Sequence, residues 1–179
     1  LLQHIAVYIS LGHAHELIVS KYTSRMSVET ARLIKQSLKS IGLGGDAEKV
    51  QTGKDFFKYF FTNYPDLRVY YKGSETFTAE DVQKSDGFDG QKLFLAVHLL
   101  AEIYDNQEVF KAYVRETVNR HRQYKMDPAH WMTFFTVFAE FLGTKMTVDE
   151  PTKAAWEELA KTFNEEAQAH LKNLDLPHV

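Results

Sequence analysis

The stretch Glu108–His121, EVFKAYVRETVNRH, gives the clearest indication of how this chain folds. Its inward-facing side chains recur at intervals of three or four residues, which is the period of an α-helix with one buried face. They are Phe110, Val114, Thr117 and Val118. His121 continues the same face at the C-terminal end of the predicted helix. The stretch therefore predicts a helix that places one histidine on its buried side.

The segments on both sides of this stretch show the same helical period. Helices are expected at about 28–41, 49–64, just after Pro65, from 78, at 90–104, 127–142 and from 149 onward. Prolines 65, 128 and 151 stand at the predicted helix boundaries, where proline is tolerated. No strand-like alternation of useful length is present. The sequence thus predicts one all-α domain of six to eight helices over residues 26–179, preceded by an N-terminal extension over residues 1–25.

Composition limits the class of protein. The chain has 179 residues, 44% of them hydrophobic, with 13 Phe and 9 Tyr, so it can fill a large core or line a flat apolar pocket. Its net charge is −3 and no basic stripe occurs, which argues against a nucleic-acid partner. No apolar run reaches the roughly 18 residues that cross a bilayer. Without a convincing signal peptide we expect a cytoplasmic protein, with a secreted form left open.

The chain has no cysteine and eight histidines. Disulfides, thiolate zinc sites, iron–sulfur clusters and covalently attached haem are therefore excluded, and a bound metal would need His, carboxylate, Met or Tyr. A lone His on an apolar helix face is either a hydrogen-bonded core residue or a metal ligand, and His121 fits both. Neighbouring polar side chains are candidates to partner its second ring nitrogen: Arg115, Glu116, Asn119 and Arg120.

From residue 27 to the end, the chain resembles the globins of nematodes. Six segments together carry the resemblance: NYPDLRVYY (63–71), TAEDVQK (78–84), LAVHLLAEIYDN (95–106), YVRETVNRHR (113–122), MDPAHWMTFFTVF (126–138) and DEPTKAAWEE (149–158). The resemblance implies the globin fold around a haem pocket, haem b as cofactor, and reversible binding of oxygen and other diatomic gases at ferrous iron. It implies a carrier, store or sensor rather than an enzyme, and it allows a homodimer.

The resemblance also assigns roles to individual residues. It makes His121 the proximal ligand of the haem iron. Leu93 matches the apolar residue that overhangs the distal face of the haem, and Pro65 matches the proline that begins the third helix. Thr117 and Phe135 are further residues expected to line the cofactor.

The distal side departs from the family pattern at three places. Phe57 stands where nematode globins usually have a Tyr, and Tyr71 stands where globins nearly always have a Phe. The segment before Gly90 is shorter by about two residues, so the distal slot falls on Asp89, with Phe88 or Gln91 as alternatives.

These departures change which side chain can stabilise an oxygen ligand. Such a ligand carries partial negative charge, so a hydrogen-bond donor stabilises it and an ionised carboxylate repels it. Phe57 offers no donor and an ionised Asp89 only accepts, whereas the hydroxyl of Tyr71 can donate. Our hypothesis is that the donor has moved from the second helix to Tyr71. The alternative is that Asp89 turns to solvent and the pocket is simply apolar.

Two other functions remain open at the level of sequence. One is a haem enzyme on the same fold, such as a nitric-oxide dioxygenase or a peroxidase-like globin, which the unusual distal residues would suit. The other is a helical interaction module that binds no haem and keeps His121 as a core residue. Fold alone does not distinguish among these functions.

Overall fold

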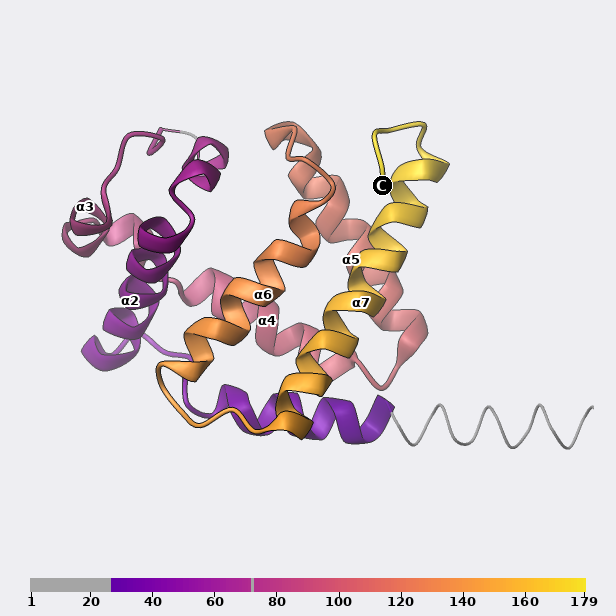
Figure 1. Ribbon diagram of the computed structural model, residues 1–179, viewed down its shortest axis with the longest axis horizontal. Helices are drawn as coiled ribbons and strands as arrows, with labels where there is room; N and C mark the ends of the chain where they lie inside the picture. Colours follow the sequence, from indigo (N-terminus) through magenta and orange to yellow (C-terminus); the bar gives the residue numbers. More distant parts are fainter. Residues whose placement is uncertain (1–26, 72) are drawn as a thin grey trace, which may run out of the picture.

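The computed structural model describes residues 27–71 and 73–179, and its regular elements are all helical (Figure 1). In chain order they are a helix over 27–38, α2 (Ala47–Asn63), η1 (Pro65–Tyr70), α3 (Ala79–Lys84), η2 (Asp86–Phe88), α4 (Gln91–Ile103), α5 (Gln107–His121), η3 (Arg122–Tyr124), α6 (His130–Gly143) and α7 (Glu150–Asn173), where η marks a 3-10 helix. The all-α prediction is confirmed. The predicted N-terminal extension, residues 1–25, lies outside the described residues.

Local side-chain chemistry sets where several helices begin. Asp46 accepts a hydrogen bond from the backbone N–H of Lys49 at the start of α2, and Asp149 does the same for Thr152 at the start of α7. Thr78 and Asp81 form a reciprocal capping box at the start of α3. Each cap satisfies backbone donors that the first helical turn leaves unpaired.

One predicted boundary differs from the structure for a local reason. The helix expected from Asp127 begins only at His130, because the Asp127 carboxylate accepts from the backbone N–H of Ala129 at 2.9 Å and forms a turn ahead of the helix. The short helix after Pro65 is a 3-10 helix that ends at Tyr70.

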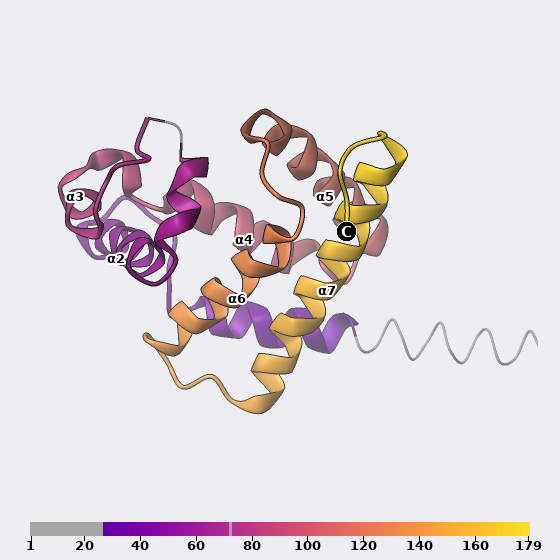
Figure 2. The ribbon, with the colours of Figure 1, turned by 45° about the horizontal axis from the view of Figure 1, so that its top comes forward.

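The core lies where the longer helices pack together. Helix α7 packs against α5 and α6, and α2 packs against α3, α4 and α6. In both views α6 and α7 lie in front of α4 and α5 (Figures 1 and 2). Large side chains without solvent contact fill the space between them: Phe56, Phe94, Phe110, Phe138, Phe141, Trp156 and Phe163. No helix among the described residues is both long enough and apolar enough to cross a membrane.

Two glycines let α2 and the start of α4 touch through their backbones. A Cβ atom on Gly53 would overlap the carbonyl oxygen of Asp89 and lie 2.9 Å from the Cα of Gly90. Gly90 also has φ 72°, a left-handed conformation that favours glycine. A side chain at either position would push the two segments apart.

We predict that Gly53→Ala destabilises the protein, because the added methyl group has no space at this crossing. Overpacking of this kind costs about 1–3 kcal/mol, which lowers the melting temperature by several degrees in a chain of this size. Gly143→Ala is the matched control, since that helical glycine has nothing within 4 Å of an added Cβ. Thermal unfolding followed by circular dichroism tests both, and equal melting temperatures for the two variants would contradict the prediction.

Candidate functional site

His121 is held by its own helix. Its Nδ1 lies 2.7 Å from the backbone carbonyl oxygen of Thr117. Because a carbonyl oxygen only accepts, Nδ1 carries the proton and Nε2 keeps a lone pair. Nε2 has no hydrogen-bond partner among residues 27–71 and 73–179. The expected side-chain partner is therefore replaced by a backbone carbonyl, while Arg115 pairs with Glu166 at 2.5 Å.

The surroundings keep this imidazole neutral. Burial lowers the pKa of His121, and the cationic side chains of Arg120 and Lys92 lower it further, against the opposing effects of the Thr117 carbonyl and Glu116. A neutral imidazole with one bare nitrogen is the form that binds a metal ion. Lys92 belongs to the first turn of α4, and its long side chain brings a positive charge within electrostatic range of the imidazole.

Two aromatic rings flank the imidazole of His121. Trp131 from α6 meets it edge to face at 5.3 Å between ring centroids, and Tyr124 from η3 lies at 5.9 Å. Trp131 is only 8% exposed and packs against Phe163 at 5.5 Å, which in turn contacts Phe135 at 5.1 Å. The imidazole is thus positioned by fixed neighbours. The spacing of three residues predicts contact with Tyr124, but no sequence signal points to Trp131.

A second aromatic cluster joins α2, η1 and η2. Phe57 lies 5.0 Å from Phe88 and 5.8 Å from Tyr71, measured between ring centroids. Phe61 closes the group at 5.2 Å from Tyr71 and 5.6 Å from Phe88. The structure therefore brings together Phe57 and Tyr71, as the resemblance implies, and adds Phe88 to them.

The hydroxyl of Tyr71 is the polar atom of this cluster. Burial among the rings raises the pKa of Tyr71 well above its usual value, so the phenol stays protonated at neutral pH. No hydrogen-bond partner for the hydroxyl occurs in the part of the chain that the structure describes. The cluster thus contains one hydrogen-bond donor, the Tyr71 hydroxyl, that no acceptor among the described residues engages.

Asp89 and Gln91, the two other candidates for the distal slot, form hydrogen bonds with backbone atoms. One oxygen of the Asp89 carboxylate accepts from the backbone N–H of Gln91 at 3.0 Å. The side chain of Gln91 accepts from the N–H of Gly44 at 2.9 Å and donates to the carbonyl of Lys49 at 3.0 Å. Phe88, the third candidate, instead packs its side chain against the rings of Phe57 and Tyr71.

Helix α4 lies between α2 and α5 in Figure 2 and packs against both. It carries Leu93, which is half-buried and packs against the core. Within the described residues no three His, Cys, Asp or Glu side chains are grouped to hold a metal ion. His121 therefore offers a single nitrogen donor in aromatic surroundings, which suits a metal whose other ligands come from a flat organic group such as a porphyrin.

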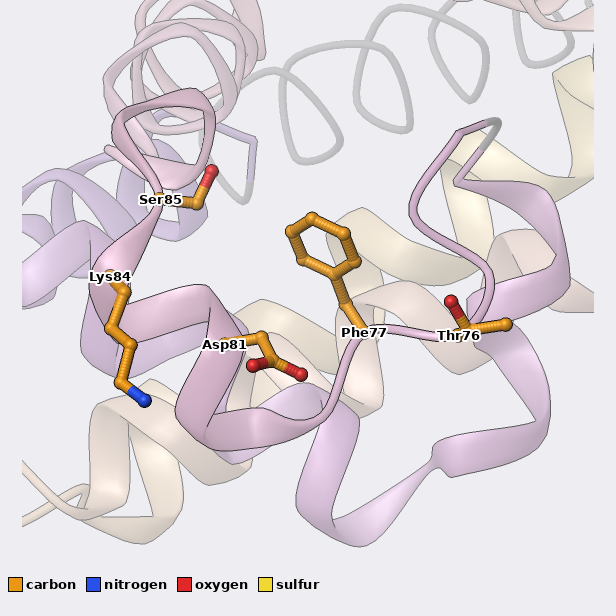
Figure 3. A pocket seen from close by; sticks show the side chains of 5 residues that line it. All are labelled: Thr76, Phe77, Asp81, Lys84 and Ser85. Atoms are coloured by element: carbon orange, nitrogen blue, oxygen red, sulfur yellow. The ribbon is translucent and has the colours of Figure 1, made fainter.

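A separate surface pocket of about 440 Å³ lies outside the second cluster (Figure 3). Its lining residues are Thr76, Phe77, Asp81, Lys84 and Ser85. The ring of Phe77 stands between Ser85 and Thr76 in this view and contacts Phe88 at 5.9 Å. None of the residues predicted for the site lines this pocket.

Comparison with known proteins gives the family. The globin family model matches residues 54–167. A globin-like protein of Caenorhabditis elegans is 56% identical over 153 residues, which cover 84% of this chain and 96% of that protein. A myoglobin of Nippostrongylus brasiliensis is 49% identical over 81% of this chain and 97% of its own length.

A solved structure agrees with the sequence comparison. A high-resolution structure of a C. elegans globin-like protein superposes with a TM-score of 0.83 at 55% identity, covering 86% of this chain and 98% of that one. Both the family resemblance and the fold predicted from the sequence are thereby confirmed: the chain belongs to the globin family and has the globin fold.

Proposed function

We propose that this chain binds oxygen reversibly at a ferrous haem b, with Nε2 of His121 as the proximal ligand to the iron. The observation that carries the proposal is the hydrogen bond from Nδ1 of His121 to Thr117, which leaves Nε2 bare and fixes the plane of the ring. The lowered pKa of His121 supports the same role, because a neutral imidazole is the form that coordinates iron.

Ferrous haem, when bound, supplies the iron centre at which a diatomic gas binds. The chain would supply the proximal ligand of the iron, His121, and the side chains that line the haem pocket. Trp131 and Tyr124 hold the imidazole in one orientation. We assign Thr117 and Phe135 to the proximal wall and Leu93 to the distal wall, as the resemblance implies.

On the distal side we assign the donor role to Tyr71. Its hydroxyl is protonated and has no partner among the described residues, so it can donate to a ligand that carries negative charge. The rings of Phe57 and Phe88 pack against the ring of Tyr71 and hold it in place. The Asp89 carboxylate accepts from the backbone N–H of Gln91 and belongs to the rim of the pocket in this proposal.

A binding role agrees better with these residues than an enzymatic one. Peroxidase-like chemistry uses a distal group that can both accept and donate a proton. The rings of Phe57 and Phe88 cannot do so. The raised pKa of Tyr71 keeps its hydroxyl protonated at neutral pH, so this hydroxyl neither accepts a proton nor gives one up readily. The relatives named above carry the names globin-like protein and myoglobin.

We assign the haem-binding unit to residues 26–179 and regard residues 1–25 as an extension to it. The cytoplasmic location expected from the sequence stays a prediction.

The first prediction concerns the proximal ligand. His121→Gly removes the nitrogen donor, so the purified protein should lose the strong absorption band of bound ferrous haem and its reversible shift with oxygen. Added imidazole should restore the band by filling the cavity with a free ligand. His98→Gly is the matched control, because His98 makes the same type of bond, from Nδ1 to the carbonyl of Phe94 at 3.0 Å.

Two outcomes would overturn the assignment. Unchanged spectra in His121→Gly would exclude His121 as the ligand. Absence of any haem band in the unmodified protein after reconstitution would favour the haem-free interaction module instead.

The second prediction concerns the distal donor. Tyr71→Phe removes one hydrogen bond worth about 1 kcal/mol, which corresponds to roughly five-fold faster dissociation of oxygen. Dissociation of carbon monoxide, a less polar ligand, should change much less. Tyr70→Phe is the control, since Tyr70 packs against His130 at 5.5 Å instead of joining the cluster. Stopped-flow ligand replacement measures these rates, and an unchanged oxygen off-rate in Tyr71→Phe would refute the donor role.

A further inference from the structure

The surface pocket beside α3 is a second place where this chain can hold a small molecule (Figure 3). Its lining residues come from the segment before α3, from α3 itself and from the residue that follows it: Thr76, Phe77, Asp81, Lys84 and Ser85. Its volume of about 440 Å³ falls within the roughly 300–1,000 Å³ of small-molecule sites. None of the residues assigned above to haem or oxygen lines it, so its ligand would be a different molecule.

The ring of Phe77 forms an apolar wall of this pocket, and its backbone is held at both ends. Nη1 of Arg68 donates to the carbonyl oxygen of Phe77 at 2.8 Å, and the N–H of Phe77 donates to the carbonyl of Ser74 at 3.0 Å. The ring is half-buried, because it packs against Phe88 on its inner side and borders the pocket on the other. A fixed ring of this kind can pack against the ring of an aromatic ligand.

Two charges of opposite sign lie near this ring. In the view of Figure 3 the carboxylate of Asp81 and the ammonium of Lys84 both lie below the ring of Phe77. The backbone N–H and the hydroxyl of Thr78 both donate to Oδ2 of Asp81, which leaves Oδ1 open to a ligand. These two bonds, together with the nearby charge of Lys84, hold the pKa of Asp81 below its usual range, so the carboxylate is ionised at neutral pH.

Neither of these charges is taken up by an ion pair. The other acidic residue of α3, Glu80, lies 3.6 Å from Lys58 of α2. Within residues 27–71 and 73–179, Asp81 and Lys84 are at ion-pair distance neither from each other nor from any other charged side chain. The pocket therefore presents one free negative and one free positive charge beside an aromatic ring.

A complementary ligand carries an ammonium and a carboxylate close together, next to a flat apolar ring. Its carboxylate can bind Nζ of Lys84 and the hydroxyl of Ser85, which accepts from the N–H of Gly87 at 3.3 Å and keeps its own proton to donate. Its ammonium can bind Oδ1 of Asp81, and its ring can pack against Phe77. A free aromatic α-amino acid carries all three groups on one small skeleton.

We propose that this pocket binds a free aromatic α-amino acid. A simple anion or cation fits less well, because it would meet a like charge at Asp81 or Lys84 without a compensating partner. Exposed ion pairs contribute little, so we expect a dissociation constant on the order of 1 mM. The inference does not rest on the proposed haem function, since the pocket uses none of the residues assigned to it.

Ligands that lack one of the charged groups test the charge pairing. Saturation-transfer difference NMR on the full-length chain measures binding of L-phenylalanine through the signals of the ligand itself. Phenylpropionate lacks the ammonium and phenethylamine lacks the carboxylate, so each should bind roughly five-fold more weakly than L-phenylalanine. Absence of saturable binding of L-phenylalanine, or equal affinities for the three ligands, would overturn the proposal.

Variants of the pocket locate the bound ligand. Lys84→Gln should weaken binding of L-phenylalanine roughly five-fold but should not weaken that of phenethylamine, which has no carboxylate for Lys84 to bind. Phe77→Leu keeps an apolar side chain against Phe88 and removes the ring, so it should weaken all three ligands. Lys153→Gln, at an exposed lysine of α7, is the matched control and should change nothing. Circular dichroism verifies that each variant is folded. If both pocket variants bind L-phenylalanine as tightly as the unmodified protein, the ligand binds elsewhere and the proposal is wrong.

Discussion

The backbones of Gly53 and Gly90 are in contact, and this contact sets the positions of the neighbouring residues of the candidate site. It seats the start of α4 directly on α2, with no side chain between them. Phe88, two residues earlier, is thereby carried into contact with Phe57 and Tyr71. Asp89 and Gln91, on either side of Gly90, are left to bond with backbone atoms. The close approach of these two glycines thus determines which side chains reach the second aromatic cluster and which stay outside it.

The site is also defined by the atoms that the protein does not use for its own stability. A polar atom in aromatic surroundings that makes no hydrogen bond within the chain is available to a ligand. Nε2 of His121 and the hydroxyl of Tyr71 are two such atoms among the described residues. One is a bare lone pair and the other a protonated donor. A bare ring nitrogen can bind a metal ion, and a protonated hydroxyl can donate a hydrogen bond to a polar ligand. Together the two atoms suit a bound metal group that carries such a ligand.

The sequence predicts features that depend on local pattern and misses those that depend on contact between distant segments. Helical period places His121 at the end of α5, and side-chain oxygens such as that of Asp149 mark helix starts. The partner of His121 is a backbone carbonyl, which any residue at position 117 would present, so composition cannot reveal it. Trp131 reaches His121 only because α6 folds back beside α5. The choice among Phe88, Asp89 and Gln91 needed the register of α4 against α2, which a shortened connection leaves ambiguous.

The side chains of helix α4 face three different environments, and these environments account for most of its residue types. Phe94 and Val97 face the core, Leu93 is partly buried against it, and Leu95 and Leu99 face outward. Helix propensity does not require leucine on the outer face, because Lys, Glu or Gln would stabilise a helix there equally well and be better solvated. Exposing a leucine to water in the free chain forgoes about 1.5–3 kcal/mol of burial energy. The two outward leucines are therefore the part of α4 that the needs of the helix alone do not explain.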